Sequence, residues 1–115
     1  MLVQYVIINQ AAVSSYPLGA VVTQGVHAAV NVVHRNHNTL DVLEFISQPL
    51  GVQHSITLAA KDSDQLLGIK QKLDDAGIDS VLWVEQPENT PTALAIIPCD
   101  KERVKPIVKR LRLLG

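Results

Sequence analysis

The segment at residues 19–33, GAVVTQGVHAAVNVV, constrains the fold most because it predicts a helix with two unlike sides. Gln24, His27 and Asn31 recur at helical spacing and share one side with position 20. Apolar residues form the opposite side at the same spacing: Val22, Val26, Ala29 and Val33. A mostly apolar helix that keeps an amide and an imidazole together predicts an opening, and a functional site, beside Gln24 and His27.

Length and composition predict a single globular domain over residues 1–115, since 47% of the residues are hydrophobic. Aromatic residues are scarce, which argues against a platform of rings for stacking nucleic acid bases. Cys99 is the one cysteine and is expected to be structural. No apolar run reaches membrane-spanning length, and no basic-then-apolar leader precedes Leu2. We therefore expect a soluble, cytoplasmic protein without a membrane partner.

Apolar periodicity and capping residues predict elements in the order βααβαββα. The strands are expected at residues 2–8, 54–60, 80–84 and 92–97. After the first helix, a second is expected at 39–47 with Asn38 as its cap, and a third follows the capping box formed by Asp62 and Gln65. Asp100 caps a last helix, in which Pro106 causes a kink or marks a late start. This alternation predicts an α/β fold with a mixed, largely buried sheet between helical layers.

Charge is distributed unevenly, although the net charge is only −1. Six of the ten Lys and Arg residues follow Asp100, interleaved with apolar residues. This pattern is typical of a solvated amphipathic helix. It also fits a patch that contacts the phosphates of a nucleic acid, for which the candidates are Lys109, Arg110 and Arg112.

Other motifs argue against metal or cofactor chemistry. His34 and His37 have no carboxylate or thiolate at ligand spacing, so no metal site is predicted. The chain has no glycine-rich phosphate loop and no dinucleotide fingerprint, so no cofactor is predicted. The polar loop from Glu85 to Thr92 separates two apolar strands, and it is either a simple hairpin connection or part of a site.

These residues resemble the archaeal and eukaryotic type of peptidyl-tRNA hydrolase. The hallmark of that family is close to GKxxAQxxHAA, and this chain has GAVVTQGVHAA at residues 19–29. The resemblance continues through residues 54–98 and the basic end KRLRLL, and LWVEQPEN at 82–89 looks like the divergent branch called peptidyl-tRNA hydrolase domain-containing proteins. The resemblance implies a four-stranded mixed sheet flanked by helices on both faces, often in a homodimer.

The resemblance also implies a reaction, the hydrolysis of the ester that joins a peptide to the 3′ end of tRNA. Gln24 and His27 match the family motif, and Glu85 and Thr90 stand for an aspartate and a threonine of a family loop. Glu85 or His27 would accept a proton from water, and the Gln24 amide would donate to the carbonyl oxygen.

Ala20 stands where the family has its functional lysine. Two functions therefore stay open. One is a hydrolase of peptidyl-tRNA or a related acyl-tRNA ester. The other is a weakened or inactive module that binds tRNA or a protein.

Overall fold

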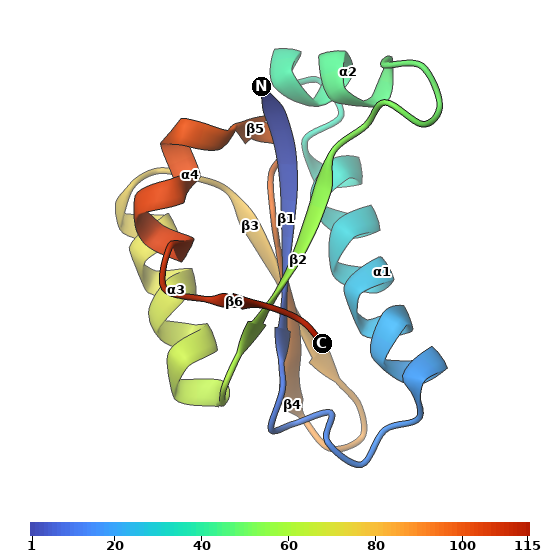
Figure 1. The fold of residues 1–115 in the computed structure, drawn as a ribbon, viewed down its shortest axis with the longest axis vertical. Helices are drawn as coiled ribbons and strands as arrows, with labels where there is room; N and C mark the ends of the chain where they lie inside the picture. The colour runs from blue at the N-terminus through green and yellow to red at the C-terminus, as the bar shows by residue number, and fades with distance from the viewer.

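A mixed β-sheet with helices on both faces forms the body of the molecule (Figure 1). The computed structural model describes residues 1–115. Its elements are β1 (Leu2–Asn9), α1 (Leu18–Arg35), α2 (Leu40–Ile46), β2 (Ser55–Ala60), α3 (Ser63–Asp75), β3 (Ser80–Glu85), β4 (Thr90–Ile96), β5 (Cys99–Asp100), α4 (Lys101–Val108) and β6 (Arg112–Leu113). The predicted α/β class is confirmed. None of the helices is long and apolar enough to cross a membrane.

The sheet has six strands, so the prediction of four strands in the order βααβαββα is wrong. The two additional strands, β5 and β6, are two residues long and flank α4. Leu2 and Val3 pair with β5, and Leu58 and Ala59 pair with β6. Cys99 in β5 is buried, and burial raises the pKa of its thiol.

Strand β1 is the centre of the sheet, as its continuous apolar run predicts. The strand order is β3-β4-β1-β2-β6, with β5 also paired to β1. β1 runs parallel to β2 and antiparallel to β4, and all its residues after Leu2 are buried. A strand that is covered on both faces needs apolar residues at successive positions rather than at alternate ones.

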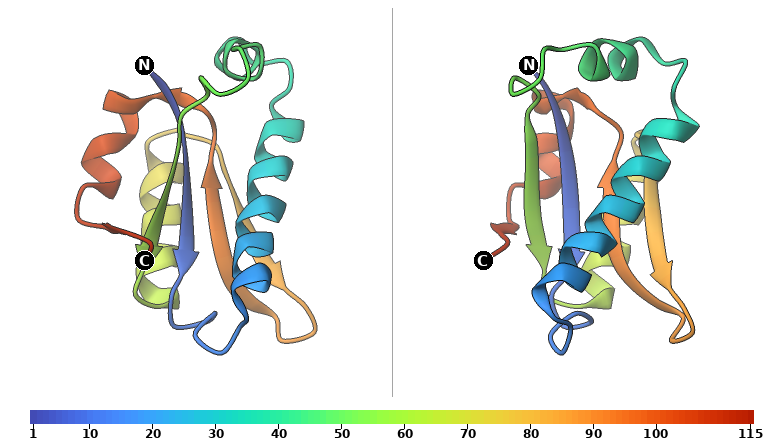
Figure 2. Two further views of the ribbon diagram at one scale, coloured as in Figure 1. Left: turned by 45° about the vertical axis from the view of Figure 1, so that its right-hand side comes forward. Right: turned by 90° about the vertical axis from the view of Figure 1, so that its right-hand side faces the viewer.

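The helices lie in two layers. α3 and α4 cover one face of the sheet, α1 crosses the other face, and α2 lies at one end (Figure 2). Asp62 accepts a hydrogen bond from the Gln65 backbone N at 2.9 Å, which confirms the cap of α3. Asp100 caps α4 in the same way by accepting from the Glu102 backbone N at 2.9 Å. α4 begins at Lys101, so Pro106 lies within the helix.

α1 turns the side that carries Gln24 toward the sheet. Gln24 is only 2% exposed and faces inward with Ala28 and Val32, whereas Val22 and Val26 are 58% and 51% exposed. A buried amide needs hydrogen-bond partners, and those of Gln24 lie on the sheet beneath the helix.

The C-terminal end of α1 is fixed to the start of β3. The Arg35 guanidinium donates to the two Asp79 carboxylate oxygens at 3.1 and 2.7 Å, and Asn36 Nδ2 donates to the same carboxylate at 2.7 Å. Burial by itself raises the pKa of Asp79, but these hydrogen bonds outweigh it and lower the pKa. The N-cap of α2 is Thr39 and not the expected Asn38.

Candidate active site

A network of buried hydrogen bonds joins α1 to the ends of β3 and β4. Gln24 Nε2 donates to Glu85 Oε2 at 2.8 Å and to the Ala20 carbonyl oxygen at 3.2 Å. Gln24 Oε1 accepts from the Thr92 hydroxyl at 2.7 Å, and Thr92 is fully buried. An ionised carboxylate only accepts hydrogen bonds, so the amide nitrogen must face Glu85. Both amide hydrogens are thus engaged, and Gln24 holds the Glu85 carboxylate in one orientation.

Glu85 is the acidic group of the site, and it lies half-buried at the last residue of β3. The hydrogen bond from Gln24 is the main cause that lowers the pKa of its carboxyl, and the Gln86 backbone N adds a weaker bond at 3.3 Å. Partial desolvation opposes this shift without reversing it. Glu85 forms no salt bridge. It is therefore an ionised base at neutral pH, without a cation in contact.

His27 stacks on Trp83 at the edge of the sheet. The two ring centroids are 4.4 Å apart and the ring planes differ by 22°. The indole Nε1 of Trp83 is buried without a hydrogen-bond partner of good geometry, and the Trp83 side chain still contributes to the lower pKa of Glu85. The structure thus brings together Gln24, His27 and Glu85, as the sequence predicts. Trp83 was not predicted, because nothing in the pattern of β3 places its ring on α1.

Thr92 is a second site residue that the sequence pattern did not reveal. In the pairing of β3 with β4, Pro91 is opposite Val84 and Ala93 is opposite Trp83, so Thr92 has no partner. This irregularity has the geometry of a β-bulge, which turns a side chain away from its regular direction. The Thr92 hydroxyl thereby reaches Gln24. A threonine directly after a proline, within an apolar strand, is the signal that could have indicated it.

Thr90 has a different environment from the one expected of a site residue. Its hydroxyl donates to the Glu88 carbonyl oxygen at 3.4 Å and makes no hydrogen bond to Gln24, His27 or Glu85. Thr90 instead lines a shallow hollow beside the start of α3, together with Asp62. The structure therefore offers Thr92, rather than Thr90, as the hydroxyl of this cluster.

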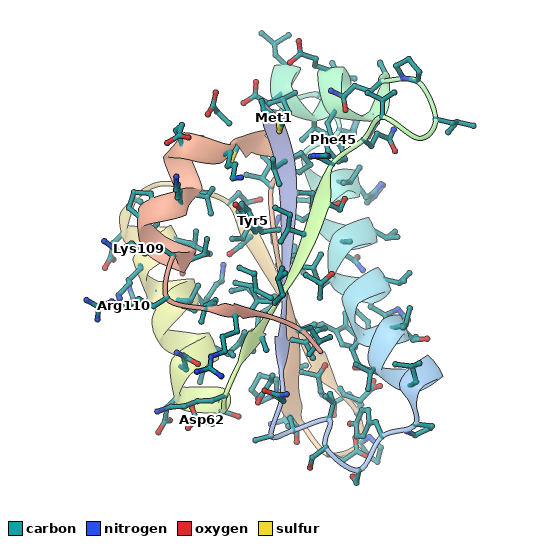
Figure 3. All side chains as sticks on the ribbon, viewed as in Figure 1. Met1, Tyr5, Phe45, Asp62, Lys109 and Arg110 are labelled. Atoms are coloured by element: carbon teal, nitrogen blue, oxygen red, sulfur yellow. The ribbon has the colours of Figure 1, made fainter.

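The basic residues of the C-terminal segment lie away from the cluster. Figure 3 shows Lys109 and Arg110 on the outer side of α4, with the sheet between them and α1. They line a groove of about 480 Å³ between α3 and α4, to which Lys72 also contributes. Arg112 follows in β6 and is exposed. The cluster and the basic groove thus occupy opposite faces of the sheet.

The side chains fit general acid–base chemistry better than metal chemistry. No group of three or more His, Cys, Asp or Glu side chains is arranged to hold a metal ion. Ala20, one turn before Gln24, contributes a backbone carbonyl to the network and no charge. The cluster therefore contains one carboxylate, one imidazole, one amide and one hydroxyl.

Comparison with known proteins identifies the family. A family model described as "Peptidyl-tRNA hydrolase PTH2" matches residues 2–114. The chain belongs to this family. The human and mouse proteins named "Putative peptidyl-tRNA hydrolase PTRHD1" are 35% and 34% identical to it, over 98% of this chain and 82% of each relative. The resemblance drawn from the sequence is thus confirmed.

A solved structure supports the fold. It is a protein of unknown function from Agrobacterium tumefaciens, with a TM-score of 0.60 and 17% sequence identity. The match covers 99% of this chain and 98% of that one. At this identity the likeness concerns the fold alone.

The hydrogen bond from Gln24 makes a testable contribution to the charge of Glu85. In a Gln24→Leu variant the pKa of the Glu85 carboxyl should rise toward its ordinary value of 4.5, because the main hydrogen bond to the ionised form is lost. Carboxyl-carbon NMR titration measures this pKa without any substrate, and circular dichroism checks that the variant is folded.

Two threonine variants serve as a matched pair for this titration. Thr92→Val should raise the same pKa by a smaller amount, because Gln24 loses the hydroxyl that orients it. Thr90→Val should leave the pKa unchanged. An unchanged titration in Gln24→Leu, or equal shifts in the two threonine variants, would contradict this account of the network.

Proposed function

We propose that this protein hydrolyses the ester bond of peptidyl-tRNA, or of a related acyl-tRNA, and so acts as a carboxylic ester hydrolase. The observation that supports this most directly is the ionised Glu85 carboxylate, held by Gln24 beside His27 on a PTH2-family fold. Membership of this family connects the chain with translation. We therefore propose the cytoplasm as its place of action.

The proposed reaction assigns one proton transfer to each titratable side chain. Glu85 accepts a proton from water as the water oxygen bonds to the ester carbonyl carbon. The tetrahedral intermediate then collapses, and the carbon–oxygen bond to the ribose breaks. The leaving 3′ oxygen takes up the proton that Glu85 accepted, which His27 carries between them, and the new carboxylic acid releases its own proton to solvent. The products are the free peptide carboxylate and tRNA.

Gln24 and Thr92 are positioning residues in this proposal. Both hydrogens of the Gln24 amide are already bound to Glu85 and to the Ala20 carbonyl oxygen, which leaves none for the substrate. Gln24 therefore orients the base rather than donating to the oxyanion. Thr92 fixes Gln24 in turn, and Thr90 has no part in the step.

A second function, a module that binds tRNA or a protein without turnover, is favoured by the charge of the site. Ala20 provides no cation, and no salt bridge compensates Glu85. Removing one preorganised oxyanion donor costs about 100- to 1000-fold in rate in other enzymes. The same fold could then keep its RNA contacts while hydrolysis becomes very slow.

Restoring a cation at position 20 separates these two functions. Ala20→Lys should raise kcat for a model peptidyl-tRNA by about tenfold or more, because the ammonium group would lie one turn before Gln24 and stabilise the oxyanion. The measurement is release of labelled peptide at high enzyme concentration, for the natural chain and the variant.

Ala20→Met is the matched control, since it adds a side chain of similar length without charge. It should give no gain, and Glu85→Gln should remove turnover in both backgrounds. If neither the natural chain nor the lysine variant releases peptide above the blank, the hydrolase proposal is wrong and the binding module stands.

The basic groove of α4 is proposed to contact tRNA phosphates outside the 3′ end, because it lies on the face of the sheet opposite the cluster. Changing Lys109 and Arg110 to alanine should weaken tRNA binding at low salt. It should also reduce the slope of log affinity against log salt by about one per lost contact. Lys105→Ala is the control, since Lys105 is exposed on α4 but does not line the groove. Equal losses in control and groove variants would exclude this contact.

A homodimer through α1 is the arrangement that the apolar surface supports. Leu18, Val22, Val26 and Val30 are exposed at successive turns of α1 and form an apolar stripe. An apolar groove of about 370 Å³ runs beside the stripe over β1 and β2. A twofold axis would bury both copies of the stripe against each other.

Sedimentation velocity tests the dimer. The natural chain should sediment as a dimer, and Val26→Glu should convert it to a monomer because a carboxylate would be buried at the interface. Thr23→Glu places the same charge on an exposed position outside the stripe and should leave the dimer intact. A monomeric natural chain at high protein concentration would refute the proposal.

A further inference from the structure

A further groove, distinct from the basic and apolar grooves, opens directly beside the proposed active site, along the free edge of β3. Its volume is about 570 Å³, and it lies between the C-terminal half of α1 and β3. Trp83 lines this groove and also stacks on His27, so the groove and the catalytic cluster share a side chain. β3 is the outermost strand of the sheet, and no further strand closes the groove on that side.

The lining of the groove has flat rings, an amide and a guanidinium, and the Asp79 carboxylate that pairs with this guanidinium is not itself part of the lining. His34 and His37 contribute imidazoles whose centroids are 6.0 Å apart with an interplanar angle of 21°. His37 Nδ1 donates to the His34 carbonyl oxygen at 2.8 Å, which fixes the second ring relative to the first. Asn31 and Arg35 complete the polar lining. The Arg35 guanidinium is held in place by Asp79 rather than mobile.

The two ends of the groove between α1 and β3 differ in charge. One end lies near the loop that joins β3 to β4. There burial raises the pKa of Tyr16 most, and the negative charges of Glu88 and Glu85 raise it further. An anionic strand would be repelled there, whereas the other end carries no unpaired carboxylate, since Asp79 is paired with Arg35. A phosphate chain that delivers an ester to Glu85 would therefore leave the cluster along the β3 edge.

We propose that the groove between α1 and β3 binds the single-stranded 3′ end of the tRNA, with a base stacked against Trp83 and phosphates beside His34 and His37. Single-stranded RNA is recognised by stacking on aromatic side chains together with polar contacts to its backbone. This groove supplies an indole for stacking and N–H donors for phosphate oxygens. One indole suffices for one base, so the scarcity of aromatic residues in the chain is no obstacle. This proposal rests on the proposed function because it assigns the same substrate to a neighbouring surface.

The test uses a short single-stranded RNA with the sequence of a tRNA 3′ end and no ester. Trp83 is the one tryptophan of the chain, so its fluorescence reports directly on a base that stacks against it. The RNA should quench this fluorescence in a saturable way. Anisotropy of labelled RNA should show about tenfold weaker binding for Trp83→Leu, with most of the affinity kept by Trp83→Phe.

The histidines provide a matched control within the chain. His34→Ala combined with His37→Ala should weaken binding of the RNA about tenfold. His54→Ala should have no effect, because His54 is exposed at the start of β2, away from the groove. Absence of quenching, or equal binding by the double variant and the natural chain, would overturn the proposal.

The outcome is independent of the hydrolysis assay. RNA binding with no peptide release would leave this groove assigned and reject the hydrolase. Peptide release from peptidyl-tRNA without binding of the RNA would support the hydrolase and reject the groove as the site of the 3′ end. Tight binding that is unaffected by the Trp83 and histidine variants would place the RNA on another surface and also reject it.

Discussion

The buried amide of Gln24 is the interaction on which the arrangement of this molecule depends. An amide without water must find partners for its oxygen and its nitrogen, or burial costs several times the gain of a typical hydrogen bond. Thr92 supplies one partner and Glu85 the other, from two adjacent strands. These two bonds fix the rotation of α1 about its axis, and through it the direction of every other side chain on the helix.

That rotation gives α1 two unlike flanks. The flank toward β3 presents His27, Asn31 and His34, and it borders the proposed catalytic cluster and the polar groove. The flank toward β1 and β2 presents valines and borders an apolar groove. The Arg35–Asp79 pair fixes the far end of the helix, so α1 is held at both ends. In the proposed function a substrate therefore reaches Glu85 from the β3 side, and the other flank is the one proposed for protein contacts.

Local sequence patterns predicted those parts of the fold that depend on local physics. The continuous apolar run of β1 and the capping box of Asp62 follow from burial and from hydrogen bonding between near neighbours, and both were correct. β5 and β6 were missed because two residues give no periodicity. The side of α1 that faces the sheet was not predicted. Helical spacing shows that two sides differ, but the partners of Gln24 lie more than sixty residues further along the chain.

In the candidate site, too, local features could be predicted from the sequence and contacts between distant segments could not. Gln24, His27 and Glu85 could be selected from the sequence because a helix side and a strand end are local features. Thr92 could not, since an irregular pairing of β3 with β4 turns its hydroxyl toward α1. Trp83 was missed for a related reason, because stacking on His27 depends on how α1 crosses the edge strand.

The missing cation at position 20 affects ester hydrolysis and RNA binding, the two parts of the proposed function, differently. When water attacks, negative charge leaves Glu85 and appears on the ester oxygen. The hydrogen bonds from Gln24 and the Gln86 backbone stabilise the charge before this transfer but not after it. They orient the base and at the same time lower its basicity. A lysine would act on the ester oxygen, and so on the transition state more than on the bound substrate. On the proposed mechanism, its absence would lower kcat without removing any group that contacts the RNA, and a hydrolase of this fold would in this way become a binding module.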